Sequence, residues 1–418
     1  MFEQLFERPH ALARQRNGPL ADDRCRYLTH CADQQMAQRT LRGIAIYLLI
    51  VARELRLADR TGEYITRTEI AAAAERWASR HPRPPAMRDT RLTRRRFTTY
   101  ATRWLTFLER LQHTVTAPQP FADHVTQFGD FMLRERGLSP HTIAYRCRSV
   151  QDFLVELTTV GLRLDTLTTA QVDELLTRKV REGEYARVTV QTCASTLRAF
   201  FRFAEVRGWC RPGLASAVMA PRVFPHEGLP VGPSWADVNR VLATLAGDKP
   251  AHIRDRALVL LLAVYGLRAG EAVALRLDDF DWEREMLTVP HGKGPKPRAY
   301  PLCRPVGDAV LRYLREVRPA SARREVFLTL RAPFRPLPRG GLGAAVARRL
   351  RALGATLPHY GPHALRHACA THLVERGLSL KEIGDHLGHQ CPETTRIYAK
   401  VDLAGLRVVA DFELEGLV

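Results

Sequence analysis

Apolar residues recur at helical spacing through most of the first 115 residues. The run LRGIAIYLLIVARELRL repeats them every three or four positions, which is typical of an amphipathic helix. Thr66 and Thr68 stand where an N-cap would open a second helix, TEIAAAAERWASR, and HPRPPA then breaks the pattern. RLTRRRFTTYATRWLTFLERL resumes it from a basic start. We therefore predict a helical domain over residues 1–115.

A second helical unit is predicted over residues 121–210, after a short linker, TAPQP. Its first helix, FADHVTQFGDFMLRERG, has Gly137 as a stop, and the next begins with Ser139 as N-cap and Pro140 in the first turn. TTAQVDELLTRKV and TVQTCASTLRAFFRFAEVRGW continue the periodicity. The pattern therefore predicts a bundle of helices in this unit.

The segment 211–233 is rich in proline and reads as a linker to a mixed domain at 234–418. In that domain Ser234 is placed to cap WADVNRVLATLAG, and the apolar helix IRDRALVLLLAVYG stops at Gly266. MLTVPHGKGPKPRAYPL predicts two short strands around a Gly/Pro-rich turn, and GGLGAAVARRLRALG predicts another helix. The expected fold class is mainly α with a small β-hairpin in the last domain (α+β).

The charge of the chain points to a polyanionic partner. The net charge is +19 and the isoelectric point is about 10.1. Charge alone favours nucleic acid over an anionic membrane only modestly. Only six lysines are present, so arginine carries most of the charge, and a lysine in a glycine hairpin is more informative than any one arginine.

The cysteines and the N-terminus indicate an intracellular protein. The eight cysteines include no C-x-x-C pair, which argues against a zinc ribbon or a disulfide framework. The N-terminus lacks the apolar core of a secretory signal, and the most apolar run, Ile44 to Ala52, is too short to span a bilayer. We expect a cytoplasmic protein with no membrane contact.

A set of side chains in the last domain matches the needs of phosphodiester chemistry. Attack on a phosphodiester needs cationic donors around its oxygens, a nucleophile, and an acid for the leaving group. The candidates are Arg268 and Glu271 in GLRAGE, Lys293 in HGKG, His363 and Arg366 in PHALRH, His389 in LGH, and Tyr398 in TTRIY.

Each of these signals is weak alone. Arg268 and Glu271 also fit a surface ion pair, and Lys293 fits a solvated turn. His363 and Arg366 share a helix face one turn apart, while His367 and His372 in the same segment are further histidines with no assigned role.

The order of the set resembles that of the tyrosine recombinases, the phage integrase family. The resemblance covers about residues 234–410, and residues 121–210 are similar to the helical, SAM-like core-binding domain of that family. Residues 1–115 lie outside the common pattern and look similar to the extra N-terminal region of some transposon-borne recombinases, which implies a role in DNA binding or in assembly. One departure is Lys400, where the family often has histidine.

The resemblance implies a site-specific recombinase or integrase of a mobile element, acting on the bacterial nucleoid without a metal or another cofactor. Tyr398 would attack DNA to form a 3′-phosphotyrosine and release a 5′-hydroxyl. The implied roles of the other residues are phosphate binding for Arg268, Arg366 and His389, protonation of the leaving oxygen for Lys293, proton transfer from the tyrosine for His363, and orientation for Glu271.

The resemblance also implies a multi-domain clamp around double-stranded DNA. Four protomers would assemble on two sites and exchange strands through a Holliday junction, with partner recombinases or DNA-bending proteins as further candidates. The C-terminal tail, VVADFELEGLV, would dock on a neighbouring protomer or fold back on its own chain. The basic residues proposed to contact DNA are Arg94, Arg95, Arg146, Arg148, Arg198, Arg202, Lys296 and Arg298.

Three other readings stay open at this stage. One is a monomeric DNA relaxer like the type IB topoisomerases, which use the same chemistry. A second is a DNA-binding regulator without catalysis, and a third is a helical protein-interaction scaffold. Covalent attachment to DNA distinguishes the enzymes from the other two.

Overall fold

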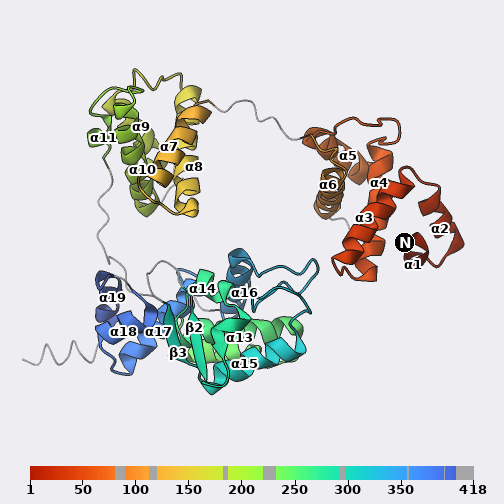
Figure 1. Ribbon diagram of the computed structural model, residues 1–418. Coiled ribbons are helices and arrows are strands. Elements are labelled where there is room, and N and C mark those ends of the chain that lie inside the picture. Colours follow the sequence, from red (N-terminus) through yellow and green to blue (C-terminus); the bar gives the residue numbers. More distant parts are fainter. Residues whose placement is uncertain are drawn as a thin grey trace, which may run out of the picture. The chain divides into compact units, whose positions relative to one another are not determined.

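The computed structural model describes residues 1–80, 90–112, 120–181, 187–219, 232–290, 297–354, 357–389 and 391–401. One compact unit spans residues 113–227, and the other comprises 1–112 and 228–418. Buried apolar side chains form separate clusters within residues 2–111, 128–218 and 238–398. Figure 1 shows the corresponding groups of helices.

The first segment is helical, as its periodicity predicts. Thr66 caps α5: its hydroxyl accepts from the Glu69 backbone N–H at 3.1 Å, and the Glu69 carboxylate accepts from the Thr66 backbone N–H at 2.8 Å. Trp104, fully buried, lies in the core of this segment. The helices are α1 (Phe2–Leu5), α2 (Pro9–Arg16), α3 (Ala21–Asp33), α4 (Gln38–Glu54), α5 (Arg67–Arg80) and α6 (Thr90–Phe107).

The second segment is also helical. Ser139 caps α8, with its hydroxyl accepting from the Thr142 backbone N–H at 3.3 Å and Pro140 in the first turn. Phenylalanines of α7 and α10 pack edge to face in the core, such as Phe128 with Phe200 at a centroid distance of 5.4 Å. The helices are α7 (Ala122–Arg134), α8 (Pro140–Thr159), α9 (Thr169–Arg181), α10 (Arg187–Val206) and α11 (Leu214–Ala217).

The third segment is built around α13 (Pro250–Val264), which is apolar on nearly all sides and packs against several neighbouring helices. Ser234 and Asp237 form the capping box of α12 (Trp235–Thr244), as the sequence predicts. The helices in contact with α13 are α12, α14 (Ala269–Ala274), α15 (Arg304–Glu316), α16 (Arg339–Ala352) and α17 (Pro362–Glu375). The pattern analysis assigns no helix to the α15 segment, although its apolar positions have helical spacing.

A small antiparallel sheet lies beside these helices (Figure 1). Strands β2 (Met286–Val289) and β3 (Arg298–Pro301) pair with Leu287 opposite Tyr300, as the predicted hairpin requires. The glycine-rich turn between them, residues 291–296, lies outside the described residues. A further strand, β1 (Phe280–Asp281), pairs with β2 and is too short to give a periodic signal.

The end of the described chain folds as α18 (Leu380–Leu387), α19 (Glu393–Arg396) and a 3₁₀ turn, η3 (Ile397–Val401). Ser379 and Glu382 cap α18 as predicted, and Gly388 ends it with a positive φ of 65°. The helix predicted from Pro392 is shorter than expected, so Tyr398 lies in η3 rather than in a second α-helical turn.

Within the described residues, no helix combines the length and the apolar character that crossing a bilayer requires.

Gly266 provides a test of how closely the helices pack. Its φ is 58°, and a Cβ at this position would lie 2.3 Å from a methyl carbon of Leu387. We expect Gly266→Ala to lower the melting temperature by several degrees, since about 1 kcal/mol shifts a domain of this size by roughly 2–4 °C. Gly340→Ala is the matched control, because its Cβ would meet nothing within 4 Å and it lies in α16. An equal effect of both changes on the melting temperature would contradict this packing.

Candidate active site

Three arginines converge on the C-terminal end of α18. The carbonyl of Leu387 accepts a hydrogen bond from Nη2 of Arg366 at 2.8 Å and one from Nη1 of Arg298 at 2.6 Å. Nη2 of Arg268 donates to the carbonyl of Gly388 at 3.1 Å. The last carbonyls of a helix lack partners within the helix and carry the negative end of its dipole. They therefore hold residues from α17, β3 and the start of α14 in one place.

Glu271 holds two of these arginines in position. One oxygen of its buried carboxylate accepts from Nη1 of Arg268 at 2.9 Å, and the other lies 2.8 Å from Nη2 of Arg298. Burial raises the pKa of Glu271, but the Arg268 backbone N–H and the two guanidinium groups outweigh burial and leave the pKa below its usual value. As described, the cluster holds three guanidinium groups and one carboxylate, which leaves an excess of positive charge.

The arginines differ in exposure. The Arg268 side chain is 40% exposed, whereas Arg366 is 3% exposed and also donates to the carbonyl of Gly266. Burial, with help from Arg268, lowers the pKa of Arg366 to about 10, so it stays charged at neutral pH. Arg298, which the sequence analysis expected to contact DNA, belongs to this cluster. It donates hydrogen bonds to the Leu387 carbonyl and the Tyr300 hydroxyl and forms an ion pair with Glu271.

His389 follows directly on the end of α18. Its backbone N–H donates to the Gly384 carbonyl at 2.9 Å, and its Nδ1 lies 2.7 Å from the buried hydroxyl of Thr395. Burial and the charges of Arg366 and Arg268 lower the pKa of His389 to about 4. If Nδ1 of a neutral His389 accepts a hydrogen bond from the Thr395 hydroxyl, the ring proton is on Nε2. There it can be donated to an anion.

Tyr398 is buried in a small cluster with Ile383, Leu387 and Val374, and is 2% exposed. Its hydroxyl lies 2.9 Å from Nδ1 of His367. Burial raises the pKa of Tyr398 to about 12, against the opposing effect of Arg366.

The histidine that contacts the tyrosine is His367, and not His363, for which the family resemblance implies a role in proton transfer. His363 lies one turn before His367 on α17, and the two rings meet edge to face at a centroid distance of 4.3 Å. The four-residue spacing of His363 and His367 is the signal in the sequence that could have indicated the second histidine.

Lys293 and Lys296 fall outside the described residues, as does the C-terminal tail from residue 402. The other candidates for catalysis, Arg268, Glu271, His363, Arg366, His389 and Tyr398, all lie in this region of α14, α17, α18 and η3.

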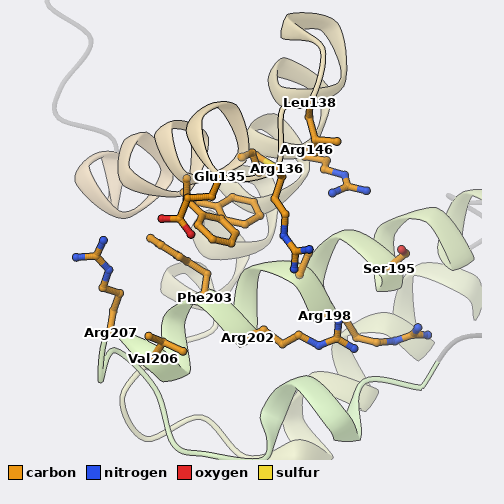
Figure 2. Close-up of a pocket in the computed structure, with 14 residues that line it drawn as sticks. Glu135, Arg136, Leu138, Arg146, Ser195, Arg198, Arg202, Phe203, Val206 and Arg207 are labelled. Carbon is orange, nitrogen blue, oxygen red and sulfur yellow. The ribbon is translucent and has the colours of Figure 1, made fainter. Parts of the chain in front are cut away.

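Arginines of the second segment line a hollow of about 720 Å³ (Figure 2). Arg146 from α8 and Arg198 and Arg202 from α10 lie around it, as the sequence analysis grouped them. In Figure 2, Arg136 points toward α10 from the end of α7. Arg136 and Arg207 also line this hollow and were not singled out from sequence, because nothing in the spacing sets them apart from the many other arginines.

Two predicted DNA contacts are placed differently. Arg148 lines a smaller hollow, of about 200 Å³, with Tyr145 and Asp152, away from the arginine group. Arg94 of the first segment forms an ion pair with Glu75 at 2.6 Å, while Arg95 is exposed.

A second arginine-lined hollow, of about 710 Å³, lies between the end of α4 and α5. Its charged lining consists of Arg53, Arg56, Arg60, Arg76, Arg80, Glu54 and Glu69. Arg60 is paired with Glu69 and Arg80 with Glu54, at 2.8 and 3.5 Å, so the lining keeps an excess of positive charge.

Among the residues that the structure describes, no group of three or more His, Cys, Asp or Glu side chains is arranged to hold a metal ion.

Models of known protein families match the second and third segments of the chain. The model of the phage integrase family matches residues 235–404, and that of the phage integrase N-terminal SAM-like domain matches residues 125–208. The two matches enclose the arginine hollow of α7, α8 and α10 and the whole described cluster around Tyr398.

The regions that match this chain cover most of the length of its curated relatives. A Sinorhizobium fredii protein described as an integrase/recombinase is 37% identical over 70% of this chain and 71% of its own. The tyrosine recombinase XerC of Alcanivorax borkumensis is 33% identical over 69% of this chain and 92% of its own.

Solved structures show the same fold at lower identity. The Tn1549 transposon integrase in complex with transposon right end DNA has a TM-score of 0.54 and 21% identity, over 68% of this chain and 99% of its own. A lambda integrase dimer bound to a core site has a TM-score of 0.52 and 19% identity, over 66% of this chain and 94% of its own. The chain therefore belongs to the phage integrase family of tyrosine recombinases, and is a site-specific recombinase that cleaves and rejoins DNA.

Proposed function

We propose that Tyr398 is the nucleophile that attacks a DNA phosphodiester, forming a 3′-phosphotyrosine and releasing a 5′-hydroxyl. The observation that carries this proposal is the convergence of Arg268, Arg298 and Arg366 on the end of α18, next to the helix and turn that bear the tyrosine. A phosphotyrosine keeps the energy of the phosphoester bond, so the released hydroxyl rejoins the strand by the reverse reaction.

The arginines would bind the non-bridging oxygens of the scissile phosphate. Arg268 is the more accessible, and two of its five N–H donors are bonded to Glu271 and Gly388, which leaves donors for an oxygen. Arg366 is fixed through two carbonyls and supplies charge from the buried side. Donors held in position before the reaction stabilise developing charge without reorganisation, and one such donor is typically worth on the order of 3 kcal/mol.

His389 would add a third kind of contact to the same phosphate. Its neutral ring, held through Nδ1 by Thr395, presents Nε2–H as a donor. Lys293 would protonate the leaving 5′-oxygen, a role that follows from its place in the order of the set. Glu271 would act through Arg268 and Arg298 rather than on the phosphate itself.

The arginine hollow of α7, α8 and α10 would hold the sugar–phosphate backbone. It gathers Arg136, Arg146, Arg198, Arg202 and Arg207 around one hollow. Arginines gathered in this way neutralise phosphates without reading sequence. We propose that residues 121–210 and 234–418, joined by the proline-rich segment 211–233, close on duplex DNA as a clamp.

The first segment would add a further DNA contact through the hollow between α4 and α5. Residues 1–112 contain twenty-one arginines and twelve acidic residues, and five of the arginines line this hollow. The excess of cationic side chains over acidic ones fits a phosphate backbone better than a protein partner, whose interface core is depleted in charge.

The biological setting that fits best is recombination of mobile DNA in a bacterium. The matched solved structures include a transposon integrase on transposon DNA and a lambda integrase dimer on a core site. We propose that four protomers act on two sites through a Holliday junction, with partner recombinases or DNA-bending proteins as accessory factors.

Covalent trapping tests the chemistry. The protein is mixed with DNA from its own genetic neighbourhood, intact and as nicked suicide substrates, without metal or ATP, and quenched in detergent. We expect a protein–DNA adduct from the native chain and none from Tyr398→Phe, which keeps the buried ring and should still bind DNA.

The outcomes separate the rival functions. An adduct that persists in Tyr398→Phe would refute the assignment of the nucleophile. Tight binding with no adduct, even on nicked DNA, would indicate a non-catalytic regulator, and site-independent relaxation of supercoiled plasmid would indicate a topoisomerase-like enzyme.

The hollow of the second segment makes a prediction about salt. Removing one arginine that neutralises a phosphate reduces the slope of log K against log salt by about 0.9. We therefore expect Arg146→Gln with Arg202→Gln to reduce the steepness of that slope by about 2 in titrations of DNA binding. Arg163→Gln is the control, because this arginine is paired with Asp165 at 2.7 Å and lies outside the hollow. A slope that the double variant leaves unchanged would remove the hollow from the DNA interface.

The hollow of the first segment makes a separate prediction. Changing Arg53, Arg56 and Arg76 together to Gln should weaken DNA binding and reduce the salt slope by about 2 to 3, while the Tyr398 adduct still forms. The control changes Arg8, Arg14 and Arg39, which are exposed and removed from the hollow, and lowers the net charge equally. Unchanged affinity and slope, with recombination abolished, would instead assign this segment to assembly.

A further inference from the structure

The hydroxyl of Tyr398 has one histidine within hydrogen-bonding distance in the described structure. Nδ1 of His367 lies 2.9 Å from it, and the two ring centroids are 5.7 Å apart. Because Tyr398 is 2% exposed, bulk water has little access to its proton. A nucleophilic tyrosine must give up that proton as it attacks, so the identity of the neighbouring acceptor matters.

His367 is in the protonation state that an acceptor needs. Burial, followed by the effects of His363, Arg366 and His359, lowers the pKa of His367 to about 4. The ring is therefore neutral at physiological pH, and with its proton on Nε2 it presents a lone pair at Nδ1 to the tyrosine.

We propose that His367 positions the Tyr398 hydroxyl and accepts its proton when Tyr398 attacks DNA, an inference that rests on the nucleophilic role proposed above. The bond from Tyr398 Oη to phosphorus forms while the bond from phosphorus to the 5′-oxygen breaks. The tyrosine proton moves to Nδ1 of His367, and the 5′-oxygen takes a separate proton from Lys293. In rejoining, His367 returns its proton to the tyrosine.

A bound phosphodiester makes transfer of the Tyr398 proton to His367 easier than it is without DNA. The groups that face His367 are His363 and Arg366 on the same helix, His359 before the helix, and Tyr398 from η3. The cationic Arg366 disfavours a second positive charge on His367. A phosphodiester held by the arginines brings negative charge that offsets this effect, so the pKa of His367 rises when substrate binds.

His363 is placed to support His367 rather than to replace it. Its ring lies edge to face against the His367 ring at 4.3 Å, with an interplanar angle of 73°. The pair thus fixes the orientation of the ring whose Nδ1 meets the tyrosine.

The test compares the pH dependence of cleavage on a nicked suicide substrate for full-length variants. His367→Asn keeps an acceptor oxygen near the place of Nδ1 but cannot take a proton, and His367→Ala leaves room for added imidazole. His363→Asn probes the neighbouring ring, and His252→Asn, on α13, is the control for loss of a histidine elsewhere. DNA affinity and circular dichroism are measured for each variant.

In the native chain His367 is already neutral, so cleavage should be nearly independent of pH between about pH 6 and pH 9. His367→Asn should cleave about a hundredfold more slowly at neutral pH, the usual magnitude for loss of a general base. Its remaining rate should rise with pH, because attack then depends on ionised Tyr398, whose pKa burial raises to about 12. Imidazole should restore part of the rate of His367→Ala.

Several results would overturn the inference. One is cleavage by His367→Asn at the native rate with a flat pH profile. Another is a slow variant that keeps the flat profile while His367→Ala gains nothing from imidazole, which would mean a purely structural role. A pH-dependent defect in His363→Asn but not in His367→Asn would move the proton acceptor to His363. If the native chain itself forms no adduct through Tyr398, the proposed function fails, and that result is distinct from all of these.

Discussion

The carbonyl end of α18 is the constraint on which the candidate active site depends. A helix must end with carbonyls that have no partner within it, and here those of Leu387 and Gly388 are met by guanidinium groups from three separate elements. Gly388 ends the helix in the left-handed conformation, where a Cβ would lie 2.7 Å from Arg298. The turn at Gly388 and the position of the arginines therefore depend on each other.

This arrangement accounts for the charge of the site. Arginines that bond to backbone carbonyls are held in place without being neutralised, whereas carboxylate partners would cancel their charge. Glu271 is the one acid in the cluster as described, and it orients two arginines while leaving positive charge over. In the proposed reaction such a cluster would attract a phosphodiester, and it would not have to rearrange when charge develops on the phosphate oxygens.

The sequence predicted those parts of the fold that depend on local contacts. The caps at Ser139, Ser234 and Ser379 lie where the pattern placed them, because a cap involves residues only three positions apart. The candidate catalytic residues were proposed from their order along the chain, and those in the described part of the structure lie in one region. The contact of Tyr398 with His367 was not, because it joins residues 31 positions apart and depends on how η3 packs on α17. Three arginines of the hollow in the second segment were candidates from sequence, but Arg136, Arg207 and the hollow in the first segment were not, since among 63 basic residues only the fold decides which of them gather.

The use of main-chain acceptors has a consequence for how this site can change over generations. A carboxylate partner is removed by a single substitution, but a peptide carbonyl is present whatever residue occupies the position. Arg366 is held by hydrogen bonds to the carbonyls of Gly266 and Leu387. Replacing the side chain at either position therefore does not remove the acceptor. Only a change that shifts the backbone after α13 or at the end of α18 can remove these acceptors. Comparisons of aligned side chains would record the arginines and give no sign of what holds them.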